Sequence, residues 1–196
     1  MSRWRRAALA AAIIAVAAAC GPTPATEIDN STTVTTAPTT RTPRIVDDSG
    51  RPDITFDPCL DLPDDVMTAA GYDAAHKEFA DMPMGSYTFL ACAYRGTELV
   101  RGTRKFSLNV LSGNIKLEEE LAKNGEISTA ITVNGRRGLR EIGPNGRNEC
   151  TYALQTNFGI VLVNRLYHSD GSALPKEEWC AGMEELTAIL EQYIAN

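Results

Sequence analysis

The stretch KFSLNVL at residues 105–111 alternates polar and apolar side chains over its first six positions. A period of two indicates a β-strand with one buried face, because successive side chains of a strand point to opposite sides of the sheet. We therefore predict a strand over 105–111 with one set of side chains facing a core. The inward set is Phe106, Leu108 and Val110, and the outward set is Lys105, Ser107 and Asn109.

Strand-like segments occur on both sides of this stretch. They span residues 86–95, 127–133, 138–142, 150–157 and 160–167. Clusters of Gly, Asn, Asp, Ser and Pro mark turns at 112–114, 134–135, 144–146, 157–159 and 169–172. Short connections of this kind favour antiparallel neighbours. The sequence therefore predicts an antiparallel sheet of about five or six strands.

Helical periodicity replaces the strand pattern in four segments. They span residues 63–70, 73–80, 115–123 and 175–194. The last is the clearest, because Pro175 opens it, acidic residues occupy its first turn and apolar residues recur at helical spacing through Ile194. Its apolar stripe is Trp179, Met183, Leu186, Leu190 and Tyr193. The predicted fold class is α+β, with this amphipathic C-terminal helix and short N-terminal helices over one face of the sheet.

The chain has five cysteines, of which an even four fall in the body of the sequence. They are Cys20, and then Cys59, Cys92, Cys150 and Cys180. Four cysteines allow three pairings. Cys150 alternates onto the core side of its strand, and Cys180 lies on the side of the terminal helix that meets the sheet. We predict a Cys150–Cys180 disulfide, which leaves Cys59–Cys92. The spacings of 33, 58 and 30 residues differ from the close Cys pairs of zinc sites, so no metal is expected.

The first twenty residues follow the plan of an export signal. Three Arg precede an uncharged apolar run at 7–19, and small residues lead directly to Cys20. This run is far shorter than the ~20 residues that span a bilayer. The small residues before Cys20 resemble a bacterial lipobox, where acyl chains are attached to a Cys and the signal is cut before it. We predict a signal peptide at 1–19 and lipidation of Cys20, with a cleaved but unlipidated signal as the alternative.

The segment after Cys20 is rich in Thr and Pro and shows almost no apolar periodicity. Such a segment cannot bury enough apolar surface to offset the entropy of ordering it. We therefore predict that residues 20–53 form a disordered tether that begins with the lipidated Cys20. A single globular domain is predicted over 54–196.

The charge balance is acidic. The chain carries 19 Lys and Arg against 25 Asp and Glu, a formal net charge of −6. Without the three Arg of the predicted signal, 16 basic residues remain and the net charge becomes −9. Binding to a nucleic-acid backbone needs a surplus of Lys and Arg, so nucleic acid is not expected as a partner.

Several features follow one another in a distinctive order along the domain. They are Phe56-Asp57-Pro58-Cys59 before a short helix that ends Ala69-Ala70-Gly71, Cys92 and Cys150 in strands, Gly159 opening a Val- and Ile-rich strand, and Cys180 on the terminal helix. With the lipobox, this order resembles a family of actinobacterial cell-envelope lipoproteins built on a cysteine-paired domain of unknown function, over residues 54–194. Members of that family often carry Trp two positions after the second domain Cys, where this chain has Tyr94. The resemblance implies a location, a fold and a disulfide pairing, but no activity.

The sequence lacks the common catalytic motifs. It contains no Gly-x-Ser-x-Gly elbow and no Gly-rich phosphate loop followed by Lys-Ser/Thr. His168, Ser169 and Asp170 are adjacent on one predicted turn, so they cannot converge as a catalytic triad does. The other histidine, His76, lies on a predicted surface helix. We therefore predict no enzymatic activity and no cofactor.

Four arginines contrast with the acidic background. They are Arg136, Arg137, Arg140 and Arg147. Guanidinium groups near a hairpin could clamp a carboxylate or phosphate of an envelope ligand. The alternative is a solvated loop whose arginines pair with neighbours such as Glu141 and Glu149.

These observations lead to one functional hypothesis and two alternatives. We expect a non-catalytic domain, held by acyl chains on Cys20 at the extracytoplasmic face of the cell membrane, that binds a protein or ligand of the envelope. The first alternative is a carrier of a lipid or another apolar small molecule, enclosed between the sheet and the terminal helix. The second is a hydrolase, which would need His168 or His76 to meet a Ser and a carboxylate from distant segments.

Overall fold

The computed structural model describes residues 44–45, 48–143, 148–168 and 174–195. The predicted signal peptide over 1–19, Cys20 and the predicted tether as far as residue 43 lie outside these residues. Two arginines from the end of the predicted tether make ion pairs with acidic residues of the domain: Arg44 with Asp57 and Asp81, and Arg51 with Glu119. Contacts with the domain therefore begin before the predicted boundary at residue 54.

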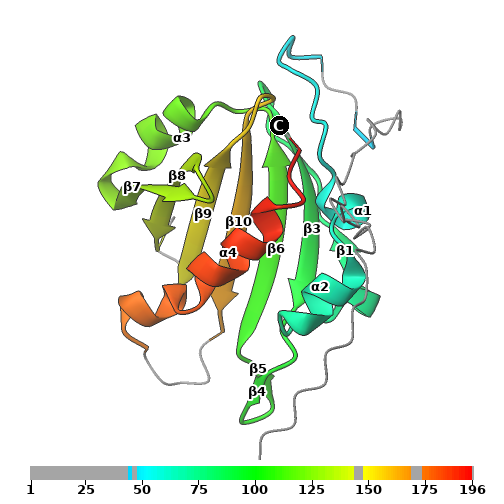
Figure 1. The fold of residues 1–196 in the computed structure, drawn as a ribbon, viewed down its shortest axis with the longest axis vertical. Helices are drawn as coiled ribbons and strands as arrows, with labels where there is room; N and C mark the ends of the chain where they lie inside the picture. Colours follow the sequence, from blue (N-terminus) through cyan, green and yellow to red (C-terminus); the bar gives the residue numbers. More distant parts are fainter. Residues whose placement is uncertain (1–43, 46–47, 144–147, 169–173, 196) are drawn as a thin grey trace, which may run out of the picture. The chain divides into compact units, whose positions relative to one another are not determined.

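The domain is built on an eight-stranded antiparallel sheet in the order β1-β3-β6-β10-β9-β8-β7, with β2 also paired to β3 (Figure 1). Its strands are β1 Glu78–Phe79, β2 Met82–Pro83, β3 Thr88–Arg95, β6 Phe106–Gly113, β7 Ser128–Val133, β8 Arg136–Ile142, β9 Glu149–Gln155 and β10 Ile160–Tyr167. A separate hairpin is formed by β4 Leu99–Val100 and β5 Thr103–Arg104. All six predicted strands are present. The predicted number was too low because β1 and β2 have two residues each, too few to show a period.

Strand β6 contains residues 106–111 of the alternating KFSLNVL stretch, and it lies between β3 and β10. Leu108 and Val110 are buried, whereas Ser107 and Asn109 on the opposite face are only partly buried. The predicted orientation is therefore confirmed. Leu111 breaks the alternation and is buried in a second core on the other face.

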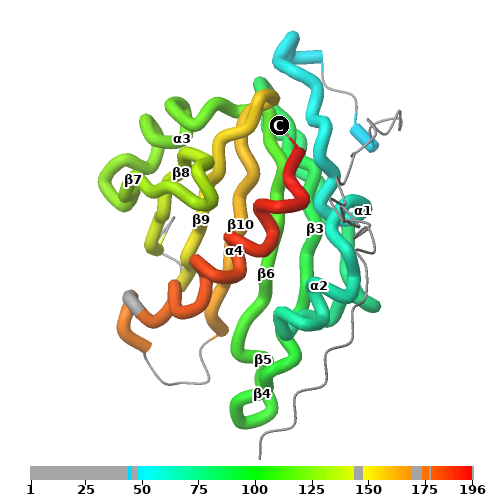
Figure 2. Tube along the Cα trace, viewed as in Figure 1, coloured from blue at the N-terminus to red at the C-terminus, as the bar shows by residue number. Residues whose placement is uncertain are grey.

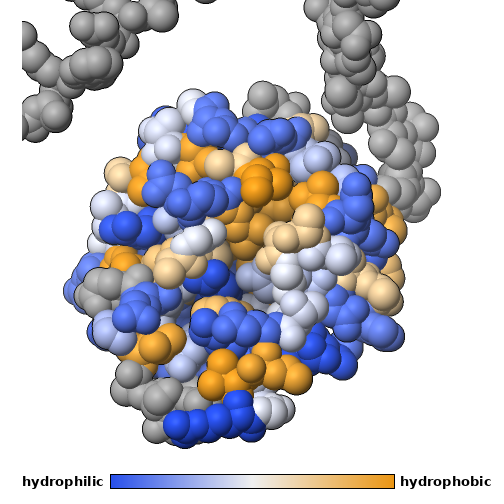
Figure 3. All heavy atoms as spheres, turned by 60° about the horizontal axis from the view of Figure 1, so that its bottom comes forward, coloured by the Kyte–Doolittle hydropathy of each residue, from blue (hydrophilic) through white to orange (hydrophobic). Residues whose placement is uncertain are grey.

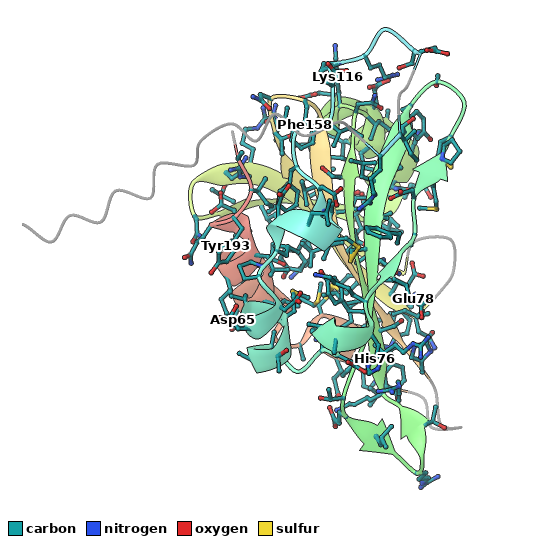
Figure 4. The ribbon with its side chains drawn as sticks, turned by 90° about the vertical axis from the view of Figure 1, so that its right-hand side faces the viewer. Asp65, His76, Glu78, Lys116, Phe158 and Tyr193 are labelled. Carbon is teal, nitrogen blue, oxygen red and sulfur yellow. A yellow bond between two sulfur atoms is a disulfide. The ribbon has the colours of Figure 1, made fainter. Side chains whose placement is uncertain are left out.

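Helices lie over both faces of the sheet, so the prediction of one covered face was wrong. Helices α1 Pro58–Asp61, α2 Asp64–Ala69 and α4 Met183–Glu191 contribute to the larger core, and α3 Leu117–Asn124 contributes to the smaller one. Helix α4 crosses the strands (Figure 2). Asp65 of α2 and Tyr193 just after α4 lie on the same side of the sheet (Figure 4).

The two cores use alternate residues of the same strands. The larger core includes Cys92, Tyr94, Leu108, Val110, Cys150, Tyr152, Leu154, Val161, Val163 and Met183. The smaller core consists of Phe89, Ala91, Leu111, Ile115, Leu117, Leu139, Ala153 and Ile160. Apolar residues on both faces of the central strands explain why helices are needed on both sides.

The predicted helix over 73–80 was wrong. Residues Ala74–His76 form a single 3-10 turn, and Lys77 is already extended. The chain then pairs with β3, where Glu78 lies opposite Ala93. Pairing with the edge of a sheet outweighs a helical pattern that is only two turns long.

The predicted helix over 175–194 is present but begins later. Lys176–Cys180 form a 3-10 helix, η4, and α4 starts only at Met183. Gly182 separates the two with a φ of 71°, a left-handed conformation that an α-helix cannot contain. Tyr193, predicted to lie in the buried stripe, is 38% exposed.

Two disulfides join the outer elements to the sheet. Cys59 of α1 is bonded to Cys92 of β3, and Cys150 of β9 is bonded to Cys180 of η4. The predicted pairing is confirmed. Helix α1 was not predicted, although Asp57 accepts a hydrogen bond from the Cys59 backbone N–H and Pro58 occupies the first position, which together are a recognisable helix start.

Candidate functional site

The structure describes three of the four predicted arginines and places them in different surroundings. Because neighbouring residues of a strand face opposite sides, Arg136 and Arg140 of β8 lie on the face of the larger core and Arg137 lies on the other face. Arg147 lies outside the described residues. Arg137 is therefore not brought together with Arg136 and Arg140.

Arg136 makes structural contacts. Its Nε donates to Glu191 Oε1 at 2.7 Å, its other nitrogens donate to two backbone carbonyls, and its side chain is 9% exposed. These contacts hold the end of α4 against β8. Arg140 lies beside Tyr152, and among the described residues its Nε has no hydrogen-bond partner.

Arg137 lies at the edge of a cavity of about 410 Å³ between α3 and the β7–β8 hairpin. The cavity is lined by Leu117, Glu118, Leu121, Ala130, Ile131, Thr132, Arg137, Gly138 and Leu139. Most of these residues are Leu, Ile, Ala or Gly, so the surface that the cavity offers on this face of the sheet is mostly apolar. Helix α3 and strands β7 and β8 lie together at the upper left of Figure 1.

The charged residues at this cavity are weakly paired. Arg137 Nη2 lies 3.8 Å from Glu118 Oε1, and the two side chains are 69% and 62% exposed. An exposed ion pair of this kind contributes ~0–1 kcal/mol, so either partner can exchange it for a charged group of a ligand. Leu121, which supplies part of the apolar lining, is itself 45% exposed.

Strand β7 is an unprotected edge. It is the last strand in the order of the sheet, and in the described part of the chain only β8 pairs with it. Its sequence, STAITV, contains no charged residue and no Pro, and Thr129, Ala130 and Thr132 are exposed. Natural edge strands usually carry charges, Pro or a bulge that prevent further pairing. This edge can therefore accept another strand.

Two carboxyl groups are buried next to the cavity, where α3 meets β8. Glu120 is 8% exposed and Glu141 is 1% exposed. Asn124 Nδ2 donates to Glu120 Oε1 at 2.9 Å and to Glu141 Oε2 at 3.4 Å, and Ser128 Oγ donates to Glu141 Oε1 at 3.2 Å. No Lys or Arg among the described residues forms an ion pair with either carboxyl group.

Burial changes the protonation of this pair. The pKa of Glu141 is raised to about 7. Loss of solvation is the larger cause, and the charge of Glu120 is the second. Burial also raises the pKa of Glu120. Glu141 therefore keeps its proton to near-neutral pH, and a proton held there reduces repulsion between the two carboxyl groups.

The sheet register extends this polar cluster across the face on which α3 lies. Neighbouring strands place one row of polar side chains opposite one another: Asn109, Asn164, Thr151, Glu141 and Ser128. Asn164 Nδ2 donates to Thr151 Oγ1 at 2.8 Å. The row connects the buried carboxyl groups with Asn109 and Asn164, which are partly exposed.

The two histidines lie apart. His76 Nδ1 lies 3.0 Å from Asp73 Oδ1, its side chain is 74% exposed, and it lies on the outside of the domain on the same side as Glu78 (Figure 4). His168 Nε2 lies 3.1 Å from Ser107 Oγ, so a histidine does meet a serine from a distant strand. Within the described residues, no carboxylate contacts His168. Ser169 and Asp170 lie outside them.

The space under the terminal helix, where an apolar cargo was considered, is filled by side chains. Trp179, Met183 and Leu154 are 8%, 0% and 0% exposed, and Phe106 packs against the same core. The cavity lies on the other face of the sheet instead. This packing counts against a carrier with the predicted geometry.

Neither a membrane-spanning helix nor a cluster of metal ligands is present among the described residues. No helix there has the length and apolar character needed to cross a membrane. No group of three or more His, Cys, Asp or Glu side chains there is close enough together to hold a metal ion.

Comparison with known proteins identifies the family. The family model "Protein of unknown function (DUF3558)" matches residues 15–193, most of the chain. The chain belongs to the DUF3558 family. No curated protein and no solved structure gives a significant match.

Sequence reasoning about this DUF3558 domain missed the cavity and the buried carboxyl pair. Helix 115–123 and strands 127–133 and 138–142 were predicted, but their packing against one another has no local signal. Glu120 lies in the acidic run Glu118–Glu119–Glu120, and such charge runs are typical of a solvated helix face. Its position three residues after Leu117, on the buried side of the helix, was the available signal.

Proposed function

We propose that this protein is a non-catalytic, lipid-anchored envelope protein whose domain binds an extended segment of a partner protein. The segment would add to the free edge of β7 and place one apolar side chain in the cavity beside α3. One observation carries this proposal: a six-residue edge strand without charge or Pro runs beside an open, mostly apolar cavity of about 410 Å³.

The chemistry of the edge favours a polypeptide. A free strand edge presents backbone N–H and C=O groups, and an added strand satisfies them with main-chain hydrogen bonds. An acyl chain could fill the cavity but could not pair with this backbone. Side chains that alternate along the added strand would reach the cavity, with Arg137 and Glu118 available to charged residues that flank the apolar one.

A library of randomised peptides displayed on phage tests this site, because the sequence of each selected peptide can be read. The selected peptides are expected to combine β-forming residues with one apolar anchor. Leu121→Lys in the cavity and Thr132→Lys on the edge are each expected to raise the Kd about tenfold or more, because each introduces a charge at an apolar or pairing position. Matched controls are Leu99→Lys and Thr103→Lys in the exposed β4–β5 hairpin, which should leave the Kd unchanged.

Two outcomes contradict the docking site. One is a library that yields no peptide above the background of an unrelated domain. The other is a set of peptides whose affinity is the same for Leu121→Lys and Thr132→Lys as for the unaltered protein.

The membrane anchor is supported by the sequence before the domain. Three Arg, a short apolar run and small residues precede Cys20, and the family match begins at residue 15, so it includes Cys20 and the predicted tether. Attachment of two or more acyl chains would hold the protein at the membrane, because each buried CH₂ contributes ~0.8 kcal/mol. Mass spectrometry of the native amino terminus should find acylated Cys20, and Cys20→Ala should release the protein from the membrane fraction. Cleavage elsewhere, or an unmodified Cys20, contradicts this part.

One contact supports hydrolysis as a second candidate function. Ser107 and His168 lie 3.1 Å apart, as a nucleophile and its base do. A fluorophosphonate probe should label Ser107 if the serine is activated, and Ser107→Ala should abolish the label. The absence of labelling in the unaltered protein removes this candidate.

A further inference from the structure

The outward backbone groups of β7 are arranged symmetrically about Ala130. The β7–β8 hairpin turns through Asn134 and Gly135, whose φ angles of 49° and 89° are both positive, as a type I′ turn requires. The two residues that flank such a turn form a hydrogen-bonded pair, and hydrogen-bonded and non-hydrogen-bonded pairs then alternate along the hairpin. Ser128, Ala130 and Thr132 therefore direct their backbone groups away from β8, to the free side of the strand.

Most of these backbone groups are available for pairing. The Ser128 N–H donates to the Gly125 carbonyl at the end of the preceding 3-10 turn. Among the described residues, the Ser128 carbonyl and both backbone groups of Ala130 and Thr132 have no hydrogen-bond partner. An added strand must therefore match one carbonyl at Ser128 and a donor and an acceptor at each of the other two positions.

A second copy of β7 matches these groups in one antiparallel register. When a two-fold axis passes beside Ala130, this residue lies opposite its own copy, and Ser128 lies opposite Thr132 of the second copy. Two hydrogen bonds then form across the Ala130 pair and one across each Ser128–Thr132 pair. The axis is perpendicular to the sheet, so the cavities of both copies open on the same face.

The side chains of this register are compatible. Ala130, the smallest residue of β7, lies at the axis on the face of the cavity. On the other face, Thr129 lies opposite Ile131 of the second copy, and β-branched residues of this kind pair well across strands. No position of β7 carries a charge, so like charges do not meet. Leu121, which is 45% exposed at the cavity, adds apolar surface from each copy.

The charges near the two ends of β7 are complementary. Glu126 precedes the strand, is exposed and forms no ion pair among the described residues. Arg137 lies opposite Thr132 near the other end, is 69% exposed and lies 3.8 Å from its nearest acid, Glu118. Antiparallel pairing brings Glu126 of each copy to roughly 12 Å from Arg137 of the other, Cα to Cα, by strand geometry. An Arg and a Glu side chain together span this distance, so two ion pairs can form.

The hydropathy of the surface alone does not select a docking face. On the end of the domain that Figure 3 turns forward, hydrophobic residues form several groups with hydrophilic residues between them (Figure 3). Scattered apolar residues of this kind are normal on protein surfaces. The free backbone of β7 is more specific, because it selects an extended partner in one direction and one register.

We propose that the strand bound by β7 is β7 of a second copy of this chain, so that the protein forms a two-fold dimer with one sheet continuous across both domains. This inference rests on the proposed docking site and names its partner. A foreign segment would have to supply a base at one end and an acid at the other, whereas a second copy supplies both from Arg137 and Glu126.

Association in solution should be weak. A single pair of strands is expected to bury less than the ~1,200 Å² at which standard interfaces begin, so the dimer belongs to the transient class. Under the proposed anchoring at Cys20, both copies would be confined to one membrane, and their effective concentration would rise without any new contact.

Concentration-dependent hydrogen exchange tests the register. The full chain carrying Cys20→Ala, which excludes association through acyl chains, is measured by NMR from about 10 μM to about 1 mM. The amides of Ala130 and Thr132 should exchange about fivefold or more slowly at the upper concentration, because they become hydrogen-bonded. Amides of the separate hairpin over 99–104 should not change. Sedimentation equilibrium should show a monomer–dimer equilibrium over the same range.

Two sets of variants separate this dimer from other modes of association. Thr132→Lys places a charge in the strand pair and should raise the dimer Kd about tenfold or more, whereas Thr103→Lys in the β4–β5 hairpin should not change it. Glu126→Lys brings like charges together and should raise the Kd about threefold or more. Combining Glu126→Lys with Arg137→Glu exchanges the two charges and should restore the affinity.

Three results overturn the proposal: a monomer at about 1 mM, a dimer as tight in Thr132→Lys as in the unaltered chain, or slowed exchange outside β7 only. Failure of the charge exchange to restore affinity overturns the antiparallel register. The docking site itself is tested separately by the peptide library. Peptides that bind β7 of a chain that stays monomeric would support the docking site and reject a second copy as its partner.

Discussion

The Glu141 carboxyl lies 1% exposed between α3 and β8, and its pKa is raised from 4.5 to about 7 by burial and by Glu120. Because the folded state holds a proton that the unfolded chain releases, the free energy of unfolding should fall as the pH rises from about 4.5 through about 7. Glu141→Gln cannot titrate, so it removes this loss, and it keeps one side-chain oxygen as an acceptor for Ser128 or Asn124. We expect the variant to be more stable than the unaltered protein above pH 7, by about 2–3 kcal/mol.

Urea denaturation at pH 5 and pH 8 measures this difference. Glu118→Gln, an exposed residue of the same helix, should change neither value. Equal pH dependence in Glu141→Gln and the unaltered protein would show that Glu141 does not titrate in this range.

The surroundings of single side chains were harder to predict from the sequence than the helices and strands. The arginines of β8 were grouped by closeness in sequence, but a strand turns neighbours to opposite faces, so Arg137 reaches the cavity and Arg136 reaches α4. The burial of Arg165 on β10, which is 7% exposed, has no local signal, because a lone arginine in an apolar strand normally faces outward. Its burial depends on contacts with Trp179 of η4 and with Tyr72, which follows α2.

At the scale of elements, the turn between β9 and β10 depends on Gly159. Its φ is 151°, and an added Cβ would lie 2.2 Å from the Gly113 carbonyl oxygen and 2.7 Å from that of Ile115. Gly159→Ala should therefore lower the free energy of unfolding by about 2–4 kcal/mol, measured by urea denaturation. The matched control is Gly125→Ala after α3, where the backbone is helical and no atom lies within 4 Å of the new Cβ. It should be neutral or stabilising by up to about 1 kcal/mol, and a similar loss in both variants would contradict this account.

Elements long enough to show a repeating apolar pattern were predicted well. Strands with six or more residues, helix α3 and the terminal helix all follow a repeating apolar pattern that is visible in the sequence. The short elements were not, because β1 and β2 owe their existence to pairing with β3. The covering of both faces was missed because strand patterns alone do not show which helix meets which face.

At the scale of the whole molecule, the two disulfides close loops of similar length, with separations of 33 and 30 residues. Replacing either pair with Ala should lower the free energy of unfolding by about 3–4 kcal/mol in the chain-entropy description. Urea denaturation of each double variant measures this loss against the unaltered, oxidised protein. A double variant as stable as the unaltered protein would contradict it.

The position of Cys59 has a mechanical consequence. Chain that enters the domain from the amino-terminal side reaches the covalent link to Cys92 at the first helix, and Cys92 lies in β3, which is hydrogen-bonded to β6 along most of its length. A force applied from that side is transferred through a covalent bond into a long, paired strand instead of acting on α1 alone. Reduction of this bond would leave α1 to bear the force, so the redox state of Cys59 and Cys92 sets how much of the domain shares the load.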